Sequence, residues 1–403
     1  MDFYGYMRPN GKAGARNYVL LLPVNRSLNF IASNVERMTR NTRHFEIPAE
    51  TGRTEVDREV IARTLIGLMN NANVGGIVLL AVKSGAGSAY KNMCAERFEE
   101  EARKTGKPFR IVYLTNVGGS YNMLGETLRL TREVLLEVSD FRRENCPLSA
   151  LTLGVKCGTS DATSGIAGNP CVGAAFDQLI RAGGTAFFSE TTEIIGAEDL
   201  VAKRAVNESV AKKILSAAKH WEDKAKATGE DIRKINPIPA NIAAGISSLE
   251  EKSLGAIAKS GTSPIQDVLK YAEMPKGSGL YFVDSWMSSL SLPLCLTACG
   301  ATIMLYQMGG GKIAQHPMMP SINPTVVSPF LYLTGNAIAY SRAPDNFDFD
   351  ASPIMTEGAS IPEMGTKLLE HLSAIASGTM TKMETLNYAE QLELYMELSL
   401  IHI

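Results

Sequence analysis

A glycine-rich stretch at residues 154–173, GVKCGTSDATSGIAGNPCVG, concentrates side chains that could bind or transform a small molecule. It continues the apolar run LTLGV, so its polar residues lie at the carboxyl end of a predicted strand, where open α/β sheets bind ligands. Its glycines let backbone amides approach a ligand, and Ser160, Asp161 and Ser164 can bind hydroxyl groups or cap a helix. The pattern predicts a site for an anionic or polyhydroxylated molecule, and a tight turn before a helix is the alternative for the SDATSG core. Whether the thiol of Cys157 takes part is left open.

Carboxylates follow the next predicted strand, TAFF. The segment SETTEIIGAE places Glu190, Glu193 and Glu198 within nine residues. Carboxylates at a strand end can bind a divalent metal or act as general bases. Glu190, nearest to the strand end, is therefore a candidate for catalysis, although a structural role fits it equally well. Glu193 and Glu198 are more typical of the first turns of a helix, whose dipole they stabilise.

Three lysines occur in contexts suited to binding an acid. Lys252 and Lys259 are seven residues apart in EEKSLGAIAKSGT, about two helical turns, which predicts that they share one helix face. Both could bind or polarise a substrate carboxylate, and a solvated helix face is the equally good alternative. Lys312 follows three glycines in QMGGGKIAQH, a run that resembles an anion-binding loop but is common elsewhere.

The segments that must position these residues alternate between short apolar runs and longer amphipathic stretches. The short runs are rich in β-branched and aromatic residues and are bounded by Gly, Pro or Asn, as strands are. The longer stretches can cross back over a sheet, which predicts an α/β protein with mainly parallel sheets flanked by helices. The predicted strands are 18–23, 76–82, 110–114, 151–155, 185–188, 279–283 and 301–306, and the predicted helices include 57–70, 94–105, 124–138 and 200–227.

Two places interrupt this alternation. The charged stretch DFRRENCP at residues 140–147 separates a predicted helix from the LTLGV strand, and NPIPANIAA at 236–244 contains two prolines that interrupt a helix. At 403 residues the chain exceeds the size at which a single core stops growing. We therefore expect an N-terminal α/β domain over residues 1–145 and a larger C-terminal α/β domain over 146–403.

Composition argues against several classes of protein. The chain is 45% hydrophobic and 20% charged with a net charge of -2, which gives no electrostatic reason to expect nucleic acid or a membrane surface as a partner. No apolar run reaches the roughly 18 to 20 residues that span a bilayer. The six cysteines are scattered, as expected for reduced thiols in a cytoplasmic protein. The oligomeric state is left open, a homo-oligomer included.

Five stretches together resemble the altronate and galactarate dehydratase family, the sugar-acid dehydratases, whose relatives include the large subunit of sulfolactate sulfo-lyase. The stretches occur in the family's order, nearly from end to end, and are GYMRPNGKAGARNYVLLLP, KCGTSDATSGIAGNP, GGTAFFSETTEIIGAE, EEKSLGAIAKSGTSPIQDVLKY and GASIPEMGTKLLE. The resemblance implies two Rossmann-like units. It also implies a lyase, generally iron dependent, that removes a proton α to a carboxylate and then expels a β-hydroxyl or β-sulfonate group.

The resemblance makes residues 154–173 a substrate-binding surface. An enolate-forming step needs a base, positive charge near the carboxylate and an acid for the leaving group. Lys156, Glu190 and Lys252 are all candidates for the base. The resulting site candidates are Lys156, Cys157, Glu190 and Lys252 for catalysis, and Ser160, Asp161, Ser164, Asn169, Lys259 and Lys312 for substrate binding.

The sequence departs from the family pattern in two respects. Members usually carry a small N-terminal domain, whereas this chain begins directly at the GYMRPNG stretch. We therefore expect either that a separate small subunit supplies that domain or that the domain is missing. In addition, Ser27, Arg53 and Ser84 stand where the family usually has cysteines. Hydroxyl and guanidinium groups are poor ligands for a soft metal, so an iron site built on these positions should not form.

Positive charge gathers at the predicted strand ends where the family usually has these cysteines. Arg26, Arg53 and Lys83 could bind a carboxylate or sulfonate in place of a metal. The family's later Thr-Thr-Gly reads Gln307-Met308-Gly309. The alternative is that these are ordinary surface charges on a paralogue that has lost catalysis.

Three hypotheses for function follow. The leading one is a hydro-lyase that removes water from a sugar acid of the altronate or galactarate type. The second is the large subunit of a sulfolactate-type sulfo-lyase. The third is a non-catalytic acid-binding subunit.

Overall fold

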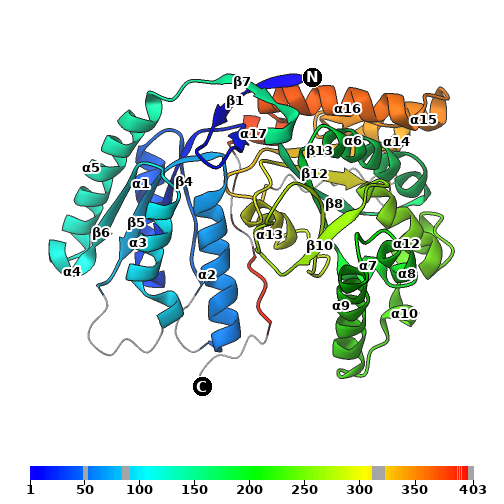
Figure 1. The fold of residues 1–403 in the computed structure, drawn as a ribbon, viewed down its shortest axis with the longest axis horizontal. Helices are drawn as coiled ribbons and strands as arrows, with labels where there is room; N and C mark the ends of the chain where they lie inside the picture. The colour runs from blue at the N-terminus through cyan, green and yellow to red at the C-terminus, as the bar shows by residue number, and fades with distance from the viewer. Residues whose placement is uncertain are drawn as a thin grey trace.

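The computed structural model describes residues 1–48, 53–83, 91–310, 323–387, 389, 391 and 393–397. Its strands form three sheets, of which two are parallel and flanked by helices (Figure 1). The fold is therefore α/β, as the alternation of apolar runs and amphipathic stretches predicts. None of the helices in the described part of the chain is both long and apolar enough to cross a lipid bilayer.

The first parallel sheet has four strands in the order β4-β3-β5-β6. They are β3 (Tyr18–Pro23), β4 (Thr42–His44), β5 (Val74–Ala81) and β6 (Phe109–Tyr113). Helices pack on both faces, which explains why the central strands are apolar throughout. One face carries α1 (Asn29–Met38) and α5 (Ser120–Ser139), and the other carries α2 (Glu55–Asn70) and α3 (Ala95–Lys104).

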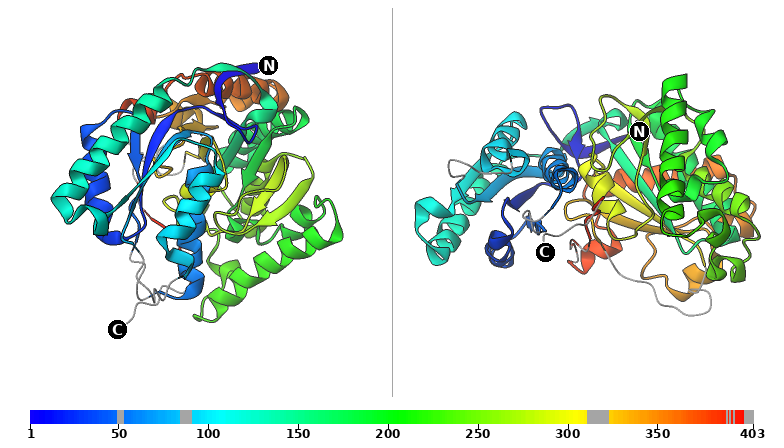
Figure 2. Two further views of the ribbon diagram at one scale, coloured as in Figure 1. Left: turned by 60° about the vertical axis from the view of Figure 1, so that its left-hand side comes forward. Right: turned by 90° about the horizontal axis from the view of Figure 1, so that it is seen from below.

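The second parallel sheet has seven strands in the order β10-β11-β9-β8-β12-β13-β14. They are β8 (Thr152–Gly158), β9 (Thr185–Phe188), β10 (Ile265–Leu269), β11 (Gly279–Val283), β12 (Ile303–Met308), β13 (Phe330–Thr334) and β14 (Phe349–Asp350). One face packs on α6 (Asn169–Arg181) and α16 (Ile361–Ala376). The other packs on α13 (Leu292–Ala298), which contacts α2, so one apolar core runs between the two sheets. Each parallel sheet with its flanking helices forms one unit, and the two units lie side by side (Figure 2).

The segment between β9 and β10 is helical and supplies one wall of the site described below. Its helices are α7 (Thr191–Ile194), α8 (Glu198–Ala202), α9 (Glu208–Lys226), α10 (Ile232–Ile235), α11 (Pro239–Ala243) and α12 (Leu249–Ile257), and α12 continues into a 3₁₀ turn, η5 (Ala258–Ser260). The single helix predicted over 200–227 is wrong, because the chain breaks between α8 and α9. Asn207 is extended and caps α9 by accepting a hydrogen bond from the Val210 N–H at 3.0 Å.

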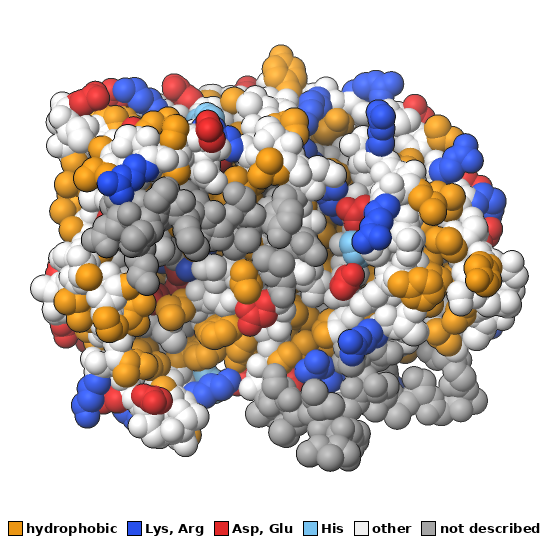
Figure 3. Space-filling model, turned by 180° about the vertical axis from the view of Figure 1, so that it is seen from behind, with side chains coloured by type: hydrophobic (Ala, Val, Ile, Leu, Met, Phe, Trp, Pro, Cys, Tyr) orange, Lys and Arg blue, Asp and Glu red, His pale blue; other side chains and the backbone are white. Residues whose placement is uncertain are grey.

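A small antiparallel sheet, β2-β1-β7, ties the amino terminus to the junction of the two units. It is formed by β1 (Asp2–Met7), β2 (Ala13–Gly14) and β7 (Glu144–Pro147). The charged stretch at 140–147 thus contains a strand that the sequence analysis did not predict. On the surface in Figure 3, Lys and Arg side chains are interspersed with Asp and Glu, in keeping with the small net charge.

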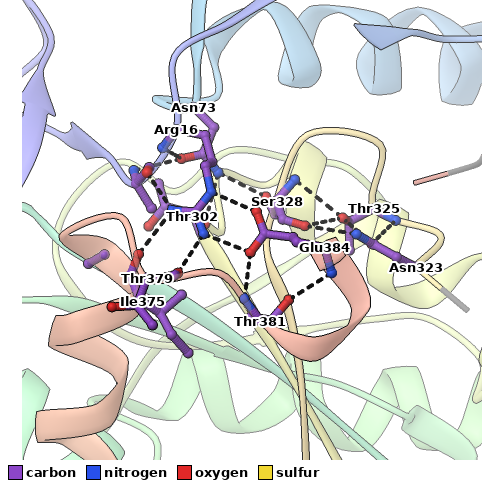
Figure 4. A network of polar contacts seen from close by, with 12 residues as sticks. Arg16, Asn73, Thr302, Asn323, Thr325, Ser328, Ile375, Thr379, Thr381 and Glu384 are labelled. Atoms are coloured by element: carbon purple, nitrogen blue, oxygen red, sulfur yellow. Dashed lines mark hydrogen bonds and ion pairs between the residues drawn. The ribbon is translucent and has the colours of Figure 1, made fainter. Parts of the chain in front are cut away.

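Buried polar contacts join the segments that meet between the two units (Figure 4). Asn73 Oδ1 accepts hydrogen bonds from the N–H groups of Ala15 and Arg16, at 2.7 and 3.1 Å, and Nδ2 donates to the Thr302 carbonyl at 2.8 Å. Arg16 forms an ion pair with Glu384 at 2.6 Å, in α17 (Lys382–Thr385). Distant parts of the chain are therefore fixed by one network.

Asn73→Ala should lower the free energy of unfolding by about 3–5 kcal/mol, because it leaves one buried N–H donor, one part-buried N–H donor and a buried carbonyl without their partner. Urea unfolding at pH 7 measures the change. Asn10→Ala is the control, since exposed Asn10 accepts a single bond from the Lys12 N–H. Equal losses in the two variants would contradict the importance of the network.

Asp348 links β13 to α17. Its Oδ2 accepts a hydrogen bond from the Tyr332 N–H at 3.0 Å, and its Oδ1 accepts one from the Lys382 N–H at 2.8 Å. Burial raises the pKa of Asp348 from 3.8 to about 6, in spite of these two donors. The folded protein therefore holds this proton to a higher pH than the unfolded chain does.

The contribution of Asp348 to stability should accordingly fall as the pH rises from about 4 to about 6, since at this position only the unfolded chain ionises freely in that window. The raised pKa corresponds to about 3 kcal/mol, which screening at a partly exposed carboxylate reduces to about 1–2 kcal/mol. Asp348→Asn removes this loss. In urea titrations at pH 4 and pH 7.5, the free energy of unfolding of the variant minus that of the unmodified protein should therefore be about 1–2 kcal/mol higher at pH 7.5. The same difference at both pH values would contradict the assignment.

Candidate active site

The polar segments singled out in the sequence converge at one end of the seven-stranded sheet. β11, β9, β8 and β12 are consecutive neighbours in this parallel sheet, so their carboxyl ends share one edge. A cavity of about 430 Å³ lies there, against residues of α11 and α12. Six of the predicted site residues line it, and they are Lys156, Cys157, Ser160, Glu190, Lys252 and Lys259.

Glu190 is the centre of this cluster. It follows β9 in a left-handed backbone conformation, with φ 76° and ψ 64°, and its side chain is 1% exposed. Oε1 lies 3.2 Å from the Lys156 ammonium, while Oε2 accepts bonds from the Lys259 ammonium and, at 3.1 Å, from the Cys157 N–H. Burial alone would raise the pKa of Glu190, but Lys259 and Lys156 outweigh burial and hold it below its ordinary value. Glu190 is therefore an ionised anchor for two lysines.

Lys156 lies beneath an aromatic ring. Its ammonium is 5.3 Å from the centre of the Tyr306 ring, and the Tyr306 hydroxyl is 2.8 Å from the Ser289 hydroxyl. Burial would lower the pKa of Lys156, but Tyr306 and Glu190 more than compensate and raise it. Two ammonium groups thus face one carboxylate, which leaves positive charge for an anionic ligand.

A second buried ion pair, Lys252 with Glu193, lies across the cavity. Lys252, from α12, is 3.1 Å from Glu193 Oε2, from α7, and donates to Asn236 Oδ1 at 2.5 Å. Lys252 and Lys259 share one face of α12 and its 3₁₀ extension, as their spacing predicts, and both point into the cavity. Glu193 has a larger part than the sequence indicated, because it is the counter-ion of Lys252.

Cys157 is a buried thiol between polar side chains. Its sulfur donates to Gln307 Oε1 at 3.1 Å, lies 3.4 Å from the Ser160 hydroxyl and accepts from Asn169 Nδ2 at 3.5 Å. Burial raises the pKa of the thiol, and the nearby Lys259 ammonium offsets this only in part. Cys157 is therefore a neutral thiol rather than a resting thiolate nucleophile.

Asp161 holds the turn that follows β8. Oδ1 accepts from the Ser164 N–H at 3.0 Å, and Oδ2 accepts from the Gly310 N–H at 2.5 Å and from Asn336 Nδ2 at 2.9 Å. Sequence reasoning assigned Asp161 to substrate binding, but these bonds engage both carboxylate oxygens. Its geometry suits a residue that positions the turn.

Ser160, Ser164 and Asn169 line a second, smaller cavity of about 240 Å³. It lies between the turn after β8 and α12, and shares Ser160 and Lys252 with the first cavity. Asn169 also donates to the Gly255 carbonyl at 2.8 Å, which fixes α6 against α12. Ser164 and Asn169 are thus placed beside the main cavity, whereas Ser160 lines both cavities.

The predicted residues of the N-terminal unit lie elsewhere. Arg26 follows β3, Lys83 follows β5, and Arg53 precedes α2, all in the unit built on the four-stranded sheet. None of them lines either cavity. Ser84 and Lys312 lie outside the described residues. The structure therefore does not bring this positive charge into the site around Glu190.

The donor chemistry at the substituted cysteine positions does not suit iron. Ser27 offers a neutral hydroxyl and Arg53 a cation, neither of which is a good ligand for a soft metal. Within the described ranges, no group of three or more His, Cys, Asp or Glu side chains is arranged to hold a metal ion.

Several residues of the site have no clear signal in the sequence. Tyr306, Ser289 and Asn241 line the main cavity, while Asn236 and Gln307 contact Lys252 and Cys157. Tyr306 and Gln307 could have been found from their place at the end of a predicted strand. Asn236 lies in an irregular, proline-containing segment, where the spacing of residues does not indicate which way a side chain points.

Comparison with known proteins agrees with this architecture. The family model described as D-galactarate/altronate dehydratase, C-terminal, matches residues 148–397, and that of the D-galactarate dehydratase/altronate hydrolase second domain matches residues 5–139. The chain is 32% identical over 394 residues to (2R)-sulfolactate sulfo-lyase subunit beta of Chromohalobacter salexigens, and the match covers 96% of each chain.

Two dehydratases are similarly related. Altronate dehydratase of Bacillus subtilis is 29% identical over 96% of this chain and 76% of its own length. Galactarate dehydratase (L-threo-forming) of Escherichia coli K12 is 30% identical over 93% of this chain and 73% of its own length. With two family models that together match most of its residues, the chain belongs to the D-galactarate/altronate dehydratase family.

Proposed function

We propose that the protein is a hydro-lyase that removes water from a small sugar acid. The observation that carries the proposal is the cavity at the strand ends, where the ammonium groups of Lys156 and Lys259 share the single carboxylate of Glu190. An excess of buried ammonium groups favours a carboxylate ligand and stabilises the negative charge that develops when the α-proton leaves.

Among the three candidates for the base, Lys252 fits the geometry best. Both oxygens of Glu190 are engaged by Lys156 and Lys259, and its lowered pKa makes it a weak proton acceptor. Lys156 has a raised pKa and stays protonated. Lys252 points into the same cavity from the other side, where its amine form can take the α-proton.

Cys157 suits the part of the acid. Its raised pKa keeps the thiol protonated, so it can give a proton to the departing hydroxyl group. Hydroxide is a poor leaving group without such a proton, whereas sulfite leaves as a stable anion. A hydro-lyase therefore depends on Cys157, and a sulfo-lyase does not.

A sulfo-lyase is the second candidate, because the relative that matches this chain over 96% of both lengths is named as a sulfo-lyase subunit. That relative's name as subunit beta also motivates the proposal that a separate small subunit completes the enzyme. A non-catalytic acid-binding role is the third candidate. The family's iron has no step in the mechanism proposed here, because Ser27 and Arg53 are unsuited to hold it.

The test is a panel of aldonates, aldarates and sulfolactate, assayed with and without added iron and with any small subunit encoded beside this chain. Formation of a 2-keto acid from a sugar acid without sulfite supports the hydro-lyase. Sulfite release that survives Cys157→Ala supports the sulfo-lyase instead. Binding without turnover under all conditions leaves the acid-binding role, and activity that requires stoichiometric iron would contradict the metal-free mechanism.

A further inference from the structure

Gln307 occupies an unusual position for a polar side chain. It lies at the end of β12, paired in register with Cys157 on β8, and it is 0% exposed. Side chains alternate along a strand, and Ile303 and Leu305 on the same face of β12 belong to the apolar core against α6. The amide also packs tightly against the turn just before α6, since a Cβ added to Gly168 would lie 2.3 Å from Gln307 Nε2.

Among the residues that the structure describes, the amide nitrogen of Gln307 has no hydrogen-bond partner, although Oε1 accepts from the Cys157 thiol. An unpaired buried N–H group is destabilising, so its presence calls for an explanation. The two ends of a glutamine amide have almost the same shape. A half-turn of the amide would therefore place Nε2, a donor, against the sulfur in place of Oε1, an acceptor.

We propose that Gln307 is a positioning residue that stabilises Cys157 in both of its protonation states. Oε1 accepts from the S–H group of the thiol, and after the half-turn Nε2 donates to the thiolate. Asn169 Nδ2 and the Ser160 hydroxyl, at 3.5 and 3.4 Å from the sulfur, complete a set of three donors for the thiolate.

The inference rests on the proposed function, in which the thiol gives up its proton once in each cycle. The neutral amine of Lys252 takes the α-proton, and the departing hydroxyl takes the S–H proton and leaves as water with the electron pair of the broken C–O bond. The thiolate of Cys157 then recovers a proton from the Lys252 ammonium. No net proton is gained or lost, and Gln307 lowers the barrier by solvating the short-lived thiolate.

Charged groups also face the sulfur, and Gln307 must be distinguished from them. Lys259 and Lys156 favour the thiolate, while Glu190 and burial oppose it. Gln307 is neutral, so its replacement by Met leaves these charges unchanged. Met308, the next residue of β12, faces the opposite core and makes no contact with the sulfur that the structure records, which makes Met308→Leu a matched control.

The experiment measures the rate of iodoacetamide alkylation of Cys157 in the intact protein from pH 6 to pH 10, by mass spectrometry of the Cys157 peptide. For Gln307→Met the midpoint should move to higher pH, and the rate at pH 8 should fall about tenfold. Gln307→Glu, which has the same shape but adds negative charge, should shift the midpoint further. Met308→Leu should stay within about twofold of the unmodified protein.

A profile within about twofold of the unmodified protein in either folded Gln307 variant overturns the proposal. Gln307→Glu preserves the shape of the side chain, so it remains a test if Gln307→Met does not fold. Alkylation needs no turnover. A shifted profile with no active substrate in the panel therefore contradicts the proposed function alone, while an unshifted profile in an active enzyme contradicts the role of Gln307 alone.

Discussion

Lys252→Met should lower kcat/KM for the substrate found in the panel by about 1,000-fold, within the range expected for loss of a general base. Lys252 is the one of the three candidates that is not part of the Glu190 cluster, and it points into the cavity from the other side. Steady-state assays of 2-keto acid formation measure the loss. Circular dichroism and the thermal midpoint establish that the variant is folded.

Lys252→Arg sharpens this test. Arginine keeps the positive charge and can still pair with Glu193, but a guanidinium does not release a proton in proteins. The variant should therefore be nearly as inactive as Lys252→Met. Lys213→Met, which removes an exposed lysine paired with Asp267 at 2.6 Å, is the control and should keep full activity. If Lys252→Arg retains activity within about tenfold, the base lies elsewhere.

Glu190→Gln should destabilise the protein by about 3–5 kcal/mol, because removing one member of a buried ion pair leaves the others uncompensated. Lys156 and Lys259 would both lose their shared counter-ion, and glutamine offers one acceptor oxygen in place of two. Urea unfolding at pH 7 measures the effect. Glu208→Gln, in an exposed pair with Lys212, should change stability by less than about 0.5 kcal/mol.

The double variant Glu190→Gln with Lys259→Met identifies the cause. If the loss comes from stranded positive charge, removing Lys259 as well should recover more than about 1 kcal/mol relative to the sum of the single variants. Additive losses would mean that Glu190 acts by packing rather than by charge. Lys156 remains in the double variant, so recovery is expected to be partial.

The sequence predicts the scaffold well where local signals decide it. The strands Tyr18–Pro23, Thr185–Phe188 and Gly279–Val283 have the predicted bounds, because each is a short apolar run closed by turn-forming residues. The common face of Lys252 and Lys259 follows from helical spacing. Both kinds of prediction depend on residues close together in the chain.

Other parts of the site depend on tertiary structure and could not be predicted. The pairing of Glu193 with Lys252 joins residues that are 59 apart, and no local pattern distinguishes it from a solvated charge. The sequence groups Arg26, Arg53 and Lys83 with the site as positive charges at predicted strand ends. They belong to a different sheet, however, and sequence alone does not tell which sheet ends face one cavity.

The network around Arg16 constrains the order in which the protein can be completed during synthesis. Arg16 leaves the ribosome 368 residues before its partner Glu384. Strand β1 likewise cannot pair until β7 has been synthesised. The four-stranded unit can collapse on the nascent chain, since its strands and helices all precede residue 140. Its amino-terminal arm, however, can be secured only after Glu384 has been translated.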